Sequence, residues 1–432
     1  MTINKLKNKK ILILGLGKEG LDTLNFLRKL FPNKIIGAGD KLQLSALKFQ
    51  VSDLLKKDGK IRLYLGDNYL KAIKNYDVVI KSPGILIHLP EIKKAYKKNK
   101  ITSQTDIFFE NCSGKIIGIT GTKGKSTTTA LIYEILKTDG IKAHLVGNIG
   151  KPVLNLLFSA TKKDVYVYEL SSHQLYNLKK SPYIAVLLNI YKEHLDYYKN
   201  FNEYKNAKTN ITRYQKKDNF FVYNSKDKEV SKIAKKSKAK KIPIKGKYYN
   251  LDIAAARAVG KIFKIPNSKI EKAIKNFKPL PHRLEYVGIF RGIKFYNDSL
   301  STIPETAIAA LDYLGKKVQT LFLGGFDREL SFEKLADRIL KSEVKNLVLF
   351  PTTGIKIWKS ILKQNKNKKT FNTFFIDNMN KAVEWAYKNT KKGTICILSC
   401  ASSSFSIFKD YKEKGDLFKK YVRKFGKHGK IY

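Results

Sequence analysis

Short apolar segments alternate with helical patterns along this 432-residue chain, and this alternation most constrains its fold. Examples are KILILGLG and YDVVIKSPG near the start, DVYVYELSS and IAVLLNIY in the middle, and KVQTLFLGG and GTICILSCASSS near the end. Buried strands that alternate with helices are typical of parallel sheets covered by helices on both faces. The chain is also too long for one ordinary core. The sequence therefore predicts an α/β protein of three domains, over residues 1–111, 112–279 and 280–432.

The first strand runs into a glycine turn with the spacing G-x-G-x-x-G, formed by Gly15, Gly17 and Gly20. Asp40 follows Gly20 by about twenty residues, as in dinucleotide-binding folds. In such a turn the backbone N–H groups and the helix N-terminus face a pyrophosphate. A nicotinamide dinucleotide and another diphosphate satisfy this requirement equally well. The turn alone therefore leaves both an oxidoreductase and a different enzyme open.

A second strand–loop–helix segment contains GITGTKGKSTTT, and its loop resembles a phosphate-binding loop. The common pattern G-x-x-x-x-G-K-[ST] fails here, because Ile119 stands where the first glycine is required. The shorter G-T-x-G-K-S-T over residues 121–127 keeps the strand–loop–helix context. Its backbone N–H groups would cradle phosphate, Lys125 would place a charge between the β- and γ-phosphates, and Ser126 would ligate Mg²⁺. We therefore expect ATP to bind at this loop.

The formal net charge of +49 would ordinarily indicate a nucleic-acid partner. Lysine is nevertheless spread along the whole chain and accompanied by many Ile, Asn and Tyr residues, as in proteins from AT-rich genomes. We expect no obligate nucleic acid, although a basic nucleic-acid-binding ATPase stays an alternative. The positive charge should attract polyanionic substrates such as nucleotides. The lysine-rich residues 228–247 come nearest to a flexible surface stretch, and we expect them to be solvated rather than functional.

Cysteine content and hydrophobic runs indicate the cellular compartment in which the protein works. Three cysteines, an odd and sparse set, favour reduced thiols. The apolar run near the N-terminus breaks at Gly15, too early for an export signal. No apolar stretch approaches the roughly eighteen residues of a membrane span. We therefore expect a cytoplasmic protein with no membrane partner.

A series of motifs along essentially the whole chain resembles the Mur ligases, the ATP-dependent amide-forming enzymes of peptidoglycan synthesis. In order, these motifs are GTKGKST, GNIG, ELSSHQL, LLNIYKEHLDYY, AKTNI, LPHRLE, YNDS and LGGFDR. With SPGI and the serine-rich SCASSSFSIFKDY, they are most similar to the family members that add glutamate to UDP-N-acetylmuramoyl-L-alanine. One such motif is weak evidence, whereas this many in order is specific.

The resemblance implies both the architecture and the reaction. The implied fold has a Rossmann-like N-terminal domain, a P-loop ATPase-like central parallel sheet and a Rossmann-like C-terminal domain. The γ-phosphoryl group of ATP would pass to the carboxylate of UDP-N-acetylmuramoyl-L-alanine, and the amine of glutamate, D-glutamate as the leading choice, would attack the acyl phosphate. The glycine turn would then bind uridine diphosphate rather than a nicotinamide dinucleotide. A monomer is expected.

The resemblance also implies three sets of binding residues. Those for the UDP-substrate are Gly17, Lys18, Glu19, Gly20, Asp40, Ser82, Pro83, Gly84, Asn148, Ser171 and His194. Those for ATP are Gly121, Thr122, Lys123, Gly124, Lys125, Ser126, Thr127, Asn250, Arg283 and Asp298. Those for the amino acid are Thr302, Arg328, Ser404 and Tyr411, and the fork of an arginine suits a carboxylate.

The implied catalytic residues are Lys125, Glu169, His194 and Lys208. Two Mg²⁺ ions, with Mn²⁺ tolerated, would be held by Ser126 and Glu169 and by His194 and a carbamylated Lys208. Each residue has an ordinary alternative: Glu169 as a helix cap, His194 as a surface residue and Lys208 as a solvated cation. A hydrolase at Ser171, Ser172 and His173 is rejected, because no G-x-S-x-G elbow surrounds them.

The chain departs from the family pattern near the amino-acid site. Leu300 stands where many relatives have a lysine, and Ile303 where they have an asparagine. The usual G-x-H-N-x-x-N is reduced to GKYYNLDIAAA, which leaves Asn250 for the adenine. An L-glutamate-adding variant and a folylpolyglutamate synthase-like enzyme therefore stay open as alternatives, although the latter lacks a UDP-binding domain.

Overall fold

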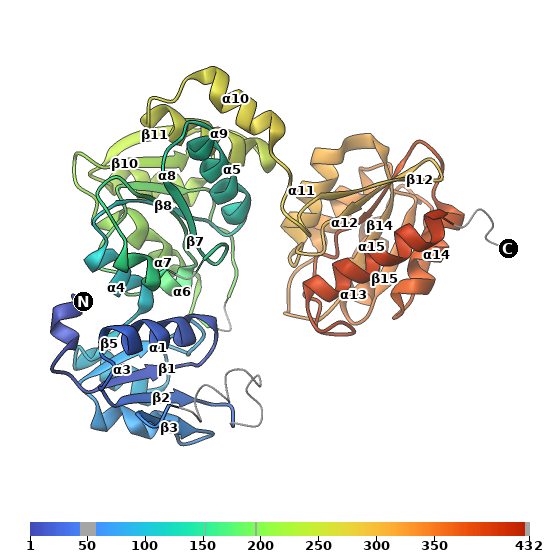
Figure 1. Cartoon of the computed structure of the whole chain (residues 1–432). Helices are drawn as coiled ribbons and strands as arrows, with labels where there is room; N and C mark the ends of the chain where they lie inside the picture. Colours follow the sequence, from blue (N-terminus) through green and yellow to red (C-terminus); the bar gives the residue numbers. More distant parts are fainter. Residues whose placement is uncertain (44–57, 152, 195–196, 428–432) are drawn as a thin grey trace. The chain divides into compact units, whose positions relative to one another are not determined.

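The computed structural model describes residues 1–43, 58–151, 153–194 and 197–427. The chain divides into two compact units, Met1–Phe277 and Lys278–Tyr432. The first unit holds two sheets and the second holds one, and helices flank each sheet (Figure 1). The predicted α/β class with three mostly parallel sheets is confirmed. In the described parts of the chain, no helix combines the length and the apolar character needed to cross a membrane.

The first sheet has five parallel strands in the order β3-β2-β1-β4-β5. Its strands are β1 (Ile11–Leu14), β2 (Ile36–Asp40), β3 (Ile61–Leu65), β4 (Val78–Lys81) and β5 (Ile101–Thr102). The associated helices are α1 (Lys18–Leu30), α3 (Pro90–Lys97), α4 (Gln104–Asn111) and the 3₁₀-helices η1 (Ile3–Leu6) and η3 (Tyr69–Asn75). Every residue of β1 is buried, as expected for a central parallel strand covered on both faces.

The second sheet has six parallel strands in the order β11-β10-β9-β6-β8-β7. Its strands are β6 (Lys115–Thr120), β7 (Ala143–Gly147), β8 (Val165–Glu169), β9 (Ile184–Leu187), β10 (Phe220–Asn224) and β11 (Lys240–Ile244). The helices are α5 (Lys125–Thr138), η4 (Leu154–Phe158), α6 (Ser172–Leu175), α7 (Phe201–Arg213), α8 (Lys228–Lys236), α9 (Tyr249–Ile262) and α10 (Asn267–Asn276). Ile117 and Ile119 of β6 share a buried cluster with Leu131 of α5 and Val259 of α9.

The prediction of a flexible stretch over residues 228–247 is wrong. Most of this segment forms helix α8 and edge strand β11. Val230, Ile233 and Ala234 are buried, and their i, i+3, i+4 spacing puts them on one face of α8. Lysines occupy most of the remaining positions of α8, so the composition of the segment does not reveal its apolar face.

One of the buried hydrophobic clusters of the first unit is shared by both of its sheets. Phe108 of α4 meets the rings of Tyr166 and Tyr168 on β8 edge-on, with centroid separations of 5.1 and 5.8 Å. All three side chains are buried. Because this aromatic cluster joins the two sheets, they belong to a single compact unit.

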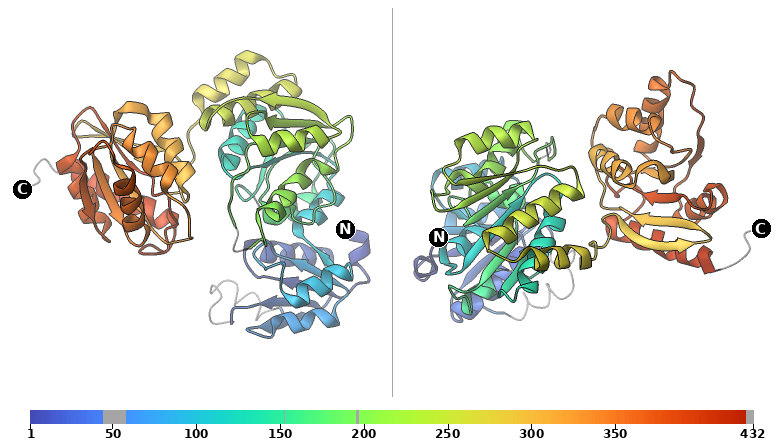
Figure 2. Two further views of the ribbon diagram at one scale, coloured as in Figure 1. Left: turned by 180° about the vertical axis from the view of Figure 1, so that it is seen from behind. Right: turned by 90° about the horizontal axis from the view of Figure 1, so that it is seen from above.

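The third sheet has the order β12-β13-β17-β14-β15-β16. Its strands are β12 (Glu285–Phe290), β13 (Ile293–Asn297), β14 (Val318–Gly324), β15 (Asn346–Phe350), β16 (Asn372–Phe375) and β17 (Ile395–Leu398). The helices are α11 (Pro304–Leu314), the 3₁₀-helix η5 (Gly315–Lys317), α12 (Glu333–Leu340), α13 (Thr353–Gln364), α14 (Met379–Asn389) and α15 (Tyr411–Lys427). Within this sheet β12 alone runs antiparallel, and it forms the yellow hairpin with β13 in the right-hand view of Figure 2.

Candidate active site

The loop between β6 and α5 has the form of a phosphate cradle. Gly124 caps α5 with φ +86°, and a Cβ atom there would lie 2.3 Å from Asp252 Oδ1. Only glycine therefore fits without displacing that carboxylate. Thr128 Oγ1 donates a hydrogen bond of 2.9 Å to Asp252 Oδ1, which fixes α9 against the loop. The loop therefore leads directly into the N-terminus of a helix, where anions are favoured.

Lys125 lies over its own loop. Its Nζ atom donates to the carbonyl oxygens of Gly121 and Thr122, each at 3.0 Å. Ser126 and Thr127 follow in the first turn of α5 and are buried. The ammonium group and the first N–H groups of α5 are therefore gathered at one place, which suits the negative oxygens of a polyphosphate.

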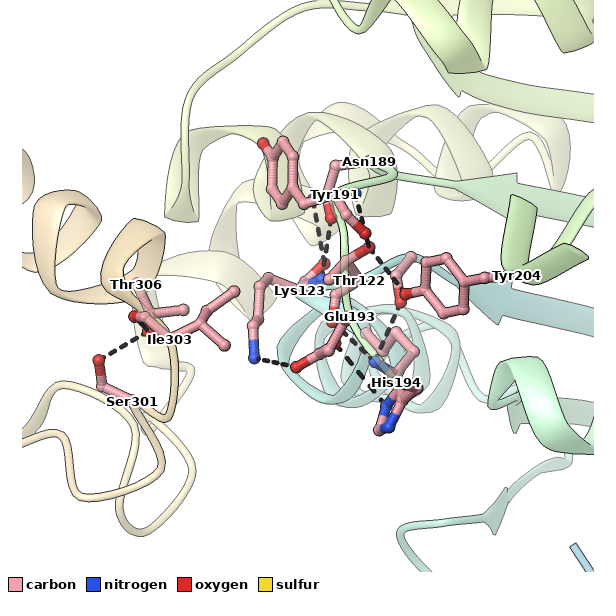
Figure 3. A network of polar contacts seen from close by, with 12 residues as sticks. Thr122, Lys123, Asn189, Tyr191, Glu193, His194, Tyr204, Ser301, Ile303 and Thr306 are labelled. Atoms are coloured by element: carbon pink, nitrogen blue, oxygen red, sulfur yellow. Dashed lines mark hydrogen bonds and ion pairs between the residues drawn. The ribbon is translucent and has the colours of Figure 1, made fainter. Parts of the chain in front are cut away.

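The segment after β9 braces this loop (Figure 3). Asn189 Oδ1 accepts from the backbone N–H of Lys123 at 2.8 Å, and Asn189 Nδ2 donates to the Lys123 carbonyl at 3.1 Å. Thr122 Oγ1 accepts from Tyr191 N at 2.9 Å and pairs with Tyr204 OH at 2.9 Å. The predicted set does not contain Asn189, Tyr191 or Tyr204, although they belong to recognised motifs or lie next to one.

A fourth unpredicted residue, Glu193, also lies at the loop. Its Oε1 atom is 3.0 Å from Lys123 Nζ, and Oε2 is 3.8 Å from His194 Nε2. Burial acts to raise the pKa of Glu193, but the charges of Lys123 and His194 outweigh it and lower the pKa to about 2. Glu193 is therefore ionised, and it holds the ammonium group of Lys123 by an ion pair.

Glu169 ends β8 at the same edge of the sheet. Its register partner is Ile119 on β6, one residue before the end of that strand. The residue is 3% exposed, and its Oε2 atom has no hydrogen-bond partner among the residues that the structure describes. The cap of α6 is Ser171, not Glu169, because Ser171 Oγ accepts from Gln174 N. A buried carboxylate oxygen without a partner is costly, and a cation would offset that cost.

Lys208 reaches the same edge from α7. Its Nζ atom donates to Gly121 O at 2.9 Å and to Thr120 Oγ1 at 3.3 Å. The side chain is buried, so Lys208 is not the solvated cation that composition favours. Burial, followed by the charge of Lys125, lowers the pKa of Lys208 well below its ordinary value.

His194 adopts a left-handed backbone with φ +59°, and its ring meets that of His173 edge-on at 4.8 Å. His173 also packs edge-on against Tyr197 at 4.2 Å. Burial, with the neighbouring charges of His194 and Lys208, lowers the pKa of His173 to about 3. His173 is therefore neutral at physiological pH. In the described residues, no group of three or more His, Cys, Asp and Glu side chains is arranged to hold a metal.

The glycine turn of the first sheet is tightly built. A Cβ atom on Gly20 would lie 1.9 Å from Gly15 O, so the turn requires glycine there. Ser82 Oγ donates to Gly15 O at 2.8 Å, and Asp40 Oδ2 accepts from Leu16 N at 2.6 Å. Ser82 and Asp40 therefore support the turn through hydrogen bonds.

The remaining residues of the predicted UDP-substrate set lie around the turn. Gly17 and Lys18 are exposed at the start of α1, Pro83 and Gly84 follow β4, and Asn148 is exposed after β7. Glu19 differs from these, because its Oε1 atom accepts a hydrogen bond of 2.7 Å from Gln174 Nε2. Burial raises the pKa of Glu19 to about 7.

The third sheet brings Arg283 and Asp298 into adjoining segments. Asp298 is buried, and its Oδ1 accepts from Leu284 N at 3.2 Å while Oδ2 accepts from Ser399 Oγ at 2.8 Å. Arg283 is half-buried beside Leu284. Asn250, the remaining predicted ATP residue, is exposed in α9 of the first unit.

The predicted amino-acid residues lie on three segments of the second unit. The bond from Phe326 N to Ser403 O at 2.8 Å joins the segments that carry Arg328 and Ser404. Arg328 is exposed, whereas the Ser404 hydroxyl is buried and has no partner among the described residues. Thr302 is half-buried ahead of α11, and Tyr411 begins α15.

The two departures from the family pattern flank Thr302. Leu300 N donates to His282 O at 3.1 Å. Ile303 is buried at the cap of α11, and its carbonyl accepts from Thr306 Oγ1 at 2.6 Å (Figure 3). Thr306 Oγ1 also pairs with Ser301 Oγ at 2.7 Å. Ile303 therefore has a packing role at the start of α11.

The phosphate cradle on a parallel sheet, next to a domain with a dinucleotide-type turn, defines a P-loop α/β protein with an added Rossmann-like domain. Residues 9–102 match the family model "Mur ligase MurD-like, N-terminal domain", and residues 119–275 match "Mur ligase middle domain". The chain belongs to the Mur ligase family.

The relatives agree along the whole length. A UDP-N-acetylmuramoylalanine–D-glutamate ligase of Acetivibrio thermocellus is 33% identical, over 97% of this chain and 97% of the relative. The enzyme of the same name from Clostridium acetobutylicum is 34% identical, over 96% and 97%. The crystal structure of the MurF ligase of Thermotoga maritima in complex with ADP has a TM-score of 0.59 at 17% identity, over 96% of this chain and 95% of that one. This structural likeness concerns the fold alone.

Proposed function

We propose that this protein is an ATP-dependent ligase that joins D-glutamate to UDP-N-acetylmuramoyl-L-alanine in peptidoglycan precursor synthesis. The observation that carries this proposal is the similarity along the full length to relatives named D-glutamate ligases. A folylpolyglutamate synthase-like enzyme is disfavoured, because the MurD-like N-terminal model matches residues 9–102. An L-glutamate-adding variant is the lesser alternative.

ATP is proposed to bind with its phosphates in the loop of residues 121–127. The substrate carboxylate attacks the γ-phosphorus, the bond to the β-phosphate oxygen breaks, and ADP leaves. The amine of glutamate then attacks the acyl carbon, and inorganic phosphate and a proton leave. Lys125 faces the charge that develops during the first step, since its ammonium group lies at the N-terminus of α5. Arg283 and Asp298 are proposed to contact the phosphate and the ribose.

Mg²⁺ would be held by Ser126 and Glu169 for one ion and by His194 and a carbamylated Lys208 for the other. The unpartnered, buried Oε2 atom of Glu169 supports this ligand set. When bound, the ions would neutralise phosphate charge and orient the reacting oxygens, and Mn²⁺ should substitute for Mg²⁺.

The carbamate at Lys208 would form from a neutral amine. The lysine nitrogen adds to the carbon of CO₂, and one proton is released. Burial favours the uncharged amine that this reaction needs, and the short contacts to Thr120 and Gly121 keep Lys208 at the end of the sheet. The product is a carboxylate-like oxygen ligand that extends beyond the reach of Asp or Glu.

The glycine turn is proposed to bind the uridine diphosphate end of the substrate, with Lys18, Asn148 and residues 82–84 around it. Arg328, Ser404, Thr302 and Tyr411 are proposed to bind the incoming glutamate. We also propose that the domains span residues 1–111, 112–279 and 280–432, and that the enzyme acts as a cytoplasmic monomer.

Phosphate release with UDP-N-acetylmuramoyl-L-alanine tests this proposal. Turnover should require both that substrate and D-glutamate, and L-glutamate, L-lysine and meso-diaminopimelate should support much less. Turnover only with a diamino acid would contradict the assignment. ATPase activity stimulated by RNA or DNA in a salt-sensitive manner would favour the nucleic-acid-binding alternative.

Arg328→Ala should raise the KM for glutamate far more than the KM for ATP. Loss of a charged hydrogen bond to a carboxylate costs about 2–3 kcal/mol, which corresponds to roughly a 30- to 150-fold change. Steady-state kinetics with each substrate varied in turn measures both constants. An unchanged glutamate KM would show that another residue binds the carboxylate.

A further inference from the structure

Gln174 makes a bridge between the two sheets of the first unit. Its Oε1 atom accepts from Ser171 N at 2.9 Å and from Ser171 Oγ at 3.1 Å, which completes the cap of α6. A backbone N–H can only donate, so Oε1 must be the atom that faces Ser171. The other end of the same amide, Nε2, donates to Glu19 Oε1 at 2.7 Å.

The two ends of this bridge lie at different proposed ligand sites. Glu19 is in the first turn of α1, directly after the glycine turn. Ser171 lies two residues after Glu169, the proposed metal ligand. Gln174 is 4% exposed, so water does not compete for the contact. A hydrogen bond from a buried amide to a carboxylate is strong in such surroundings.

The segment that Gln174 caps is also joined to the end of β6, just before the phosphate loop. Leu170, between Glu169 and Ser171, donates its N–H to Ile119 O at 2.9 Å and accepts from Thr120 Oγ1 at 2.7 Å. Lys208 Nζ in turn donates to Thr120 Oγ1. Hydrogen bonds on either side of the Leu170–Ser171 backbone therefore link Glu19, beside the glycine turn, to Lys208, the residue that is proposed to carry the carbamate.

We propose that Gln174 is a positioning residue, which sets the glycine turn and the Glu169–Ser171 segment at the separation that the UDP-linked substrate spans. Glu19 is then its acceptor rather than a ligand of the diphosphate. The inference rests on the proposed function, because it names the UDP-linked substrate of that same site. Loss of the hydrogen bond between Gln174 and Glu19 should weaken binding of the UDP-linked substrate and leave binding of ATP unchanged. The reason is that the side chain of Gln174 bonds to Ser171 and Glu19 rather than to the phosphate loop.

Gln174→Glu is the informative change. A carboxylate at this position still accepts from Ser171, so the cap of α6 is kept. At an assay pH of 9, well above the pKa of about 7 of Glu19, its other oxygen faces Glu19 Oε1 without a proton to donate, and repulsion between like charges replaces the hydrogen bond. We expect the KM for UDP-N-acetylmuramoyl-L-alanine to rise about tenfold or more, with the KM for ATP within twofold of the parent.

A double-mutant cycle with Glu19→Gln separates positioning from general damage. When both substitutions are present, an amide donor again faces a carboxylate acceptor, with the two side chains exchanged. The additional effect of Gln174→Glu on the KM should therefore fall below threefold when Glu19→Gln is already in place. Gln104→Glu is the matched control, because Gln104 is another buried glutamine that bonds to α1 but not to Ser171. Its Nε2 atom donates to Glu19 O, Asp22 Oδ2 and Thr23 Oγ1.

Steady-state kinetics and calorimetric binding of UDP-N-acetylmuramoyl-L-alanine are to be measured on the parent, the three single variants and the double variant, with thermal unfolding as the check of folding. Equal effects of Gln174→Glu with and without Glu19→Gln would overturn the inference. So would a Gln104→Glu variant with the same selective rise in KM. A parent enzyme that neither binds nor uses this substrate would overturn the proposed function, and this inference with it.

Discussion

Replacement of Lys125 by alanine should lower ATP turnover about a hundred- to thousandfold, or 3–4 kcal/mol in the barrier, and leave the fold intact. The ammonium group lies at the N-terminus of α5, where it contacts the carbonyl oxygens of Gly121 and Thr122. ATP phosphates would replace these carbonyl contacts, and the charge would then oppose the negative charge that develops on the γ-phosphoryl group. Its loss removes a fixed positive charge from the place where this negative charge develops.

Phosphate release under saturating substrates measures the effect, and thermal unfolding reports on the fold. Lys137→Ala is the matched control, because Lys137 is exposed in the last turn of the same helix. The control should keep the parental rate. Turnover of the Lys125 variant within threefold of the parent would contradict the phosphate-loop assignment.

The buried parallel strands were predictable because each is a short apolar run followed by small or polar residues. Strand β6 ends at Thr120 and β8 ends at Glu169, where the expected loops begin. The edge strand β11 and helix α8 escaped prediction, since lysines at their exposed positions hide a narrow apolar face. Strands were therefore predictable where the strand itself is an apolar run, including the edge strand β3, and not where lysines and a proline occupy most of its positions, as in β11.

The candidate site was predictable only where a motif carries it. Glycines such as Gly20 are fixed by local backbone requirements, as the approach of Gly20 to Gly15 O shows, and Lys125 belongs to the loop motif itself. Bracing contacts such as Asn189 with Lys123 depend on tertiary structure, so spacing in the sequence does not reveal them. The bond between Gln174 and Glu19 joins residues 155 positions apart, so spacing in the sequence does not reveal it either.

Lys208→Ala should be nearly inactive, with a loss on the order of a thousandfold, comparable to the removal of a main transition-state contact. In the proposed enzyme, the carbamate of Lys208 is an anionic ligand, and alanine leaves its place empty. Small carboxylic acids such as formate and acetate should partly restore turnover of this variant, because they supply the missing anionic oxygens. Lys205→Ala is the control on the same helix, since Lys205 pairs with Glu229 away from the loop and should stay near the parental rate.

Lys208→Arg separates the carbamate from a simple positive charge. Guanidinium stays protonated and does not react with CO₂ under these conditions, so this variant should be as inactive as the alanine variant. Restoration by formate should fail, because the arginine side chain fills the space and keeps its charge. An arginine variant with activity near that of the parent would refute the carbamate. An electron-density map of the nucleotide- and metal-bound enzyme with an unmodified Lys208 turned to solvent would refute it as well.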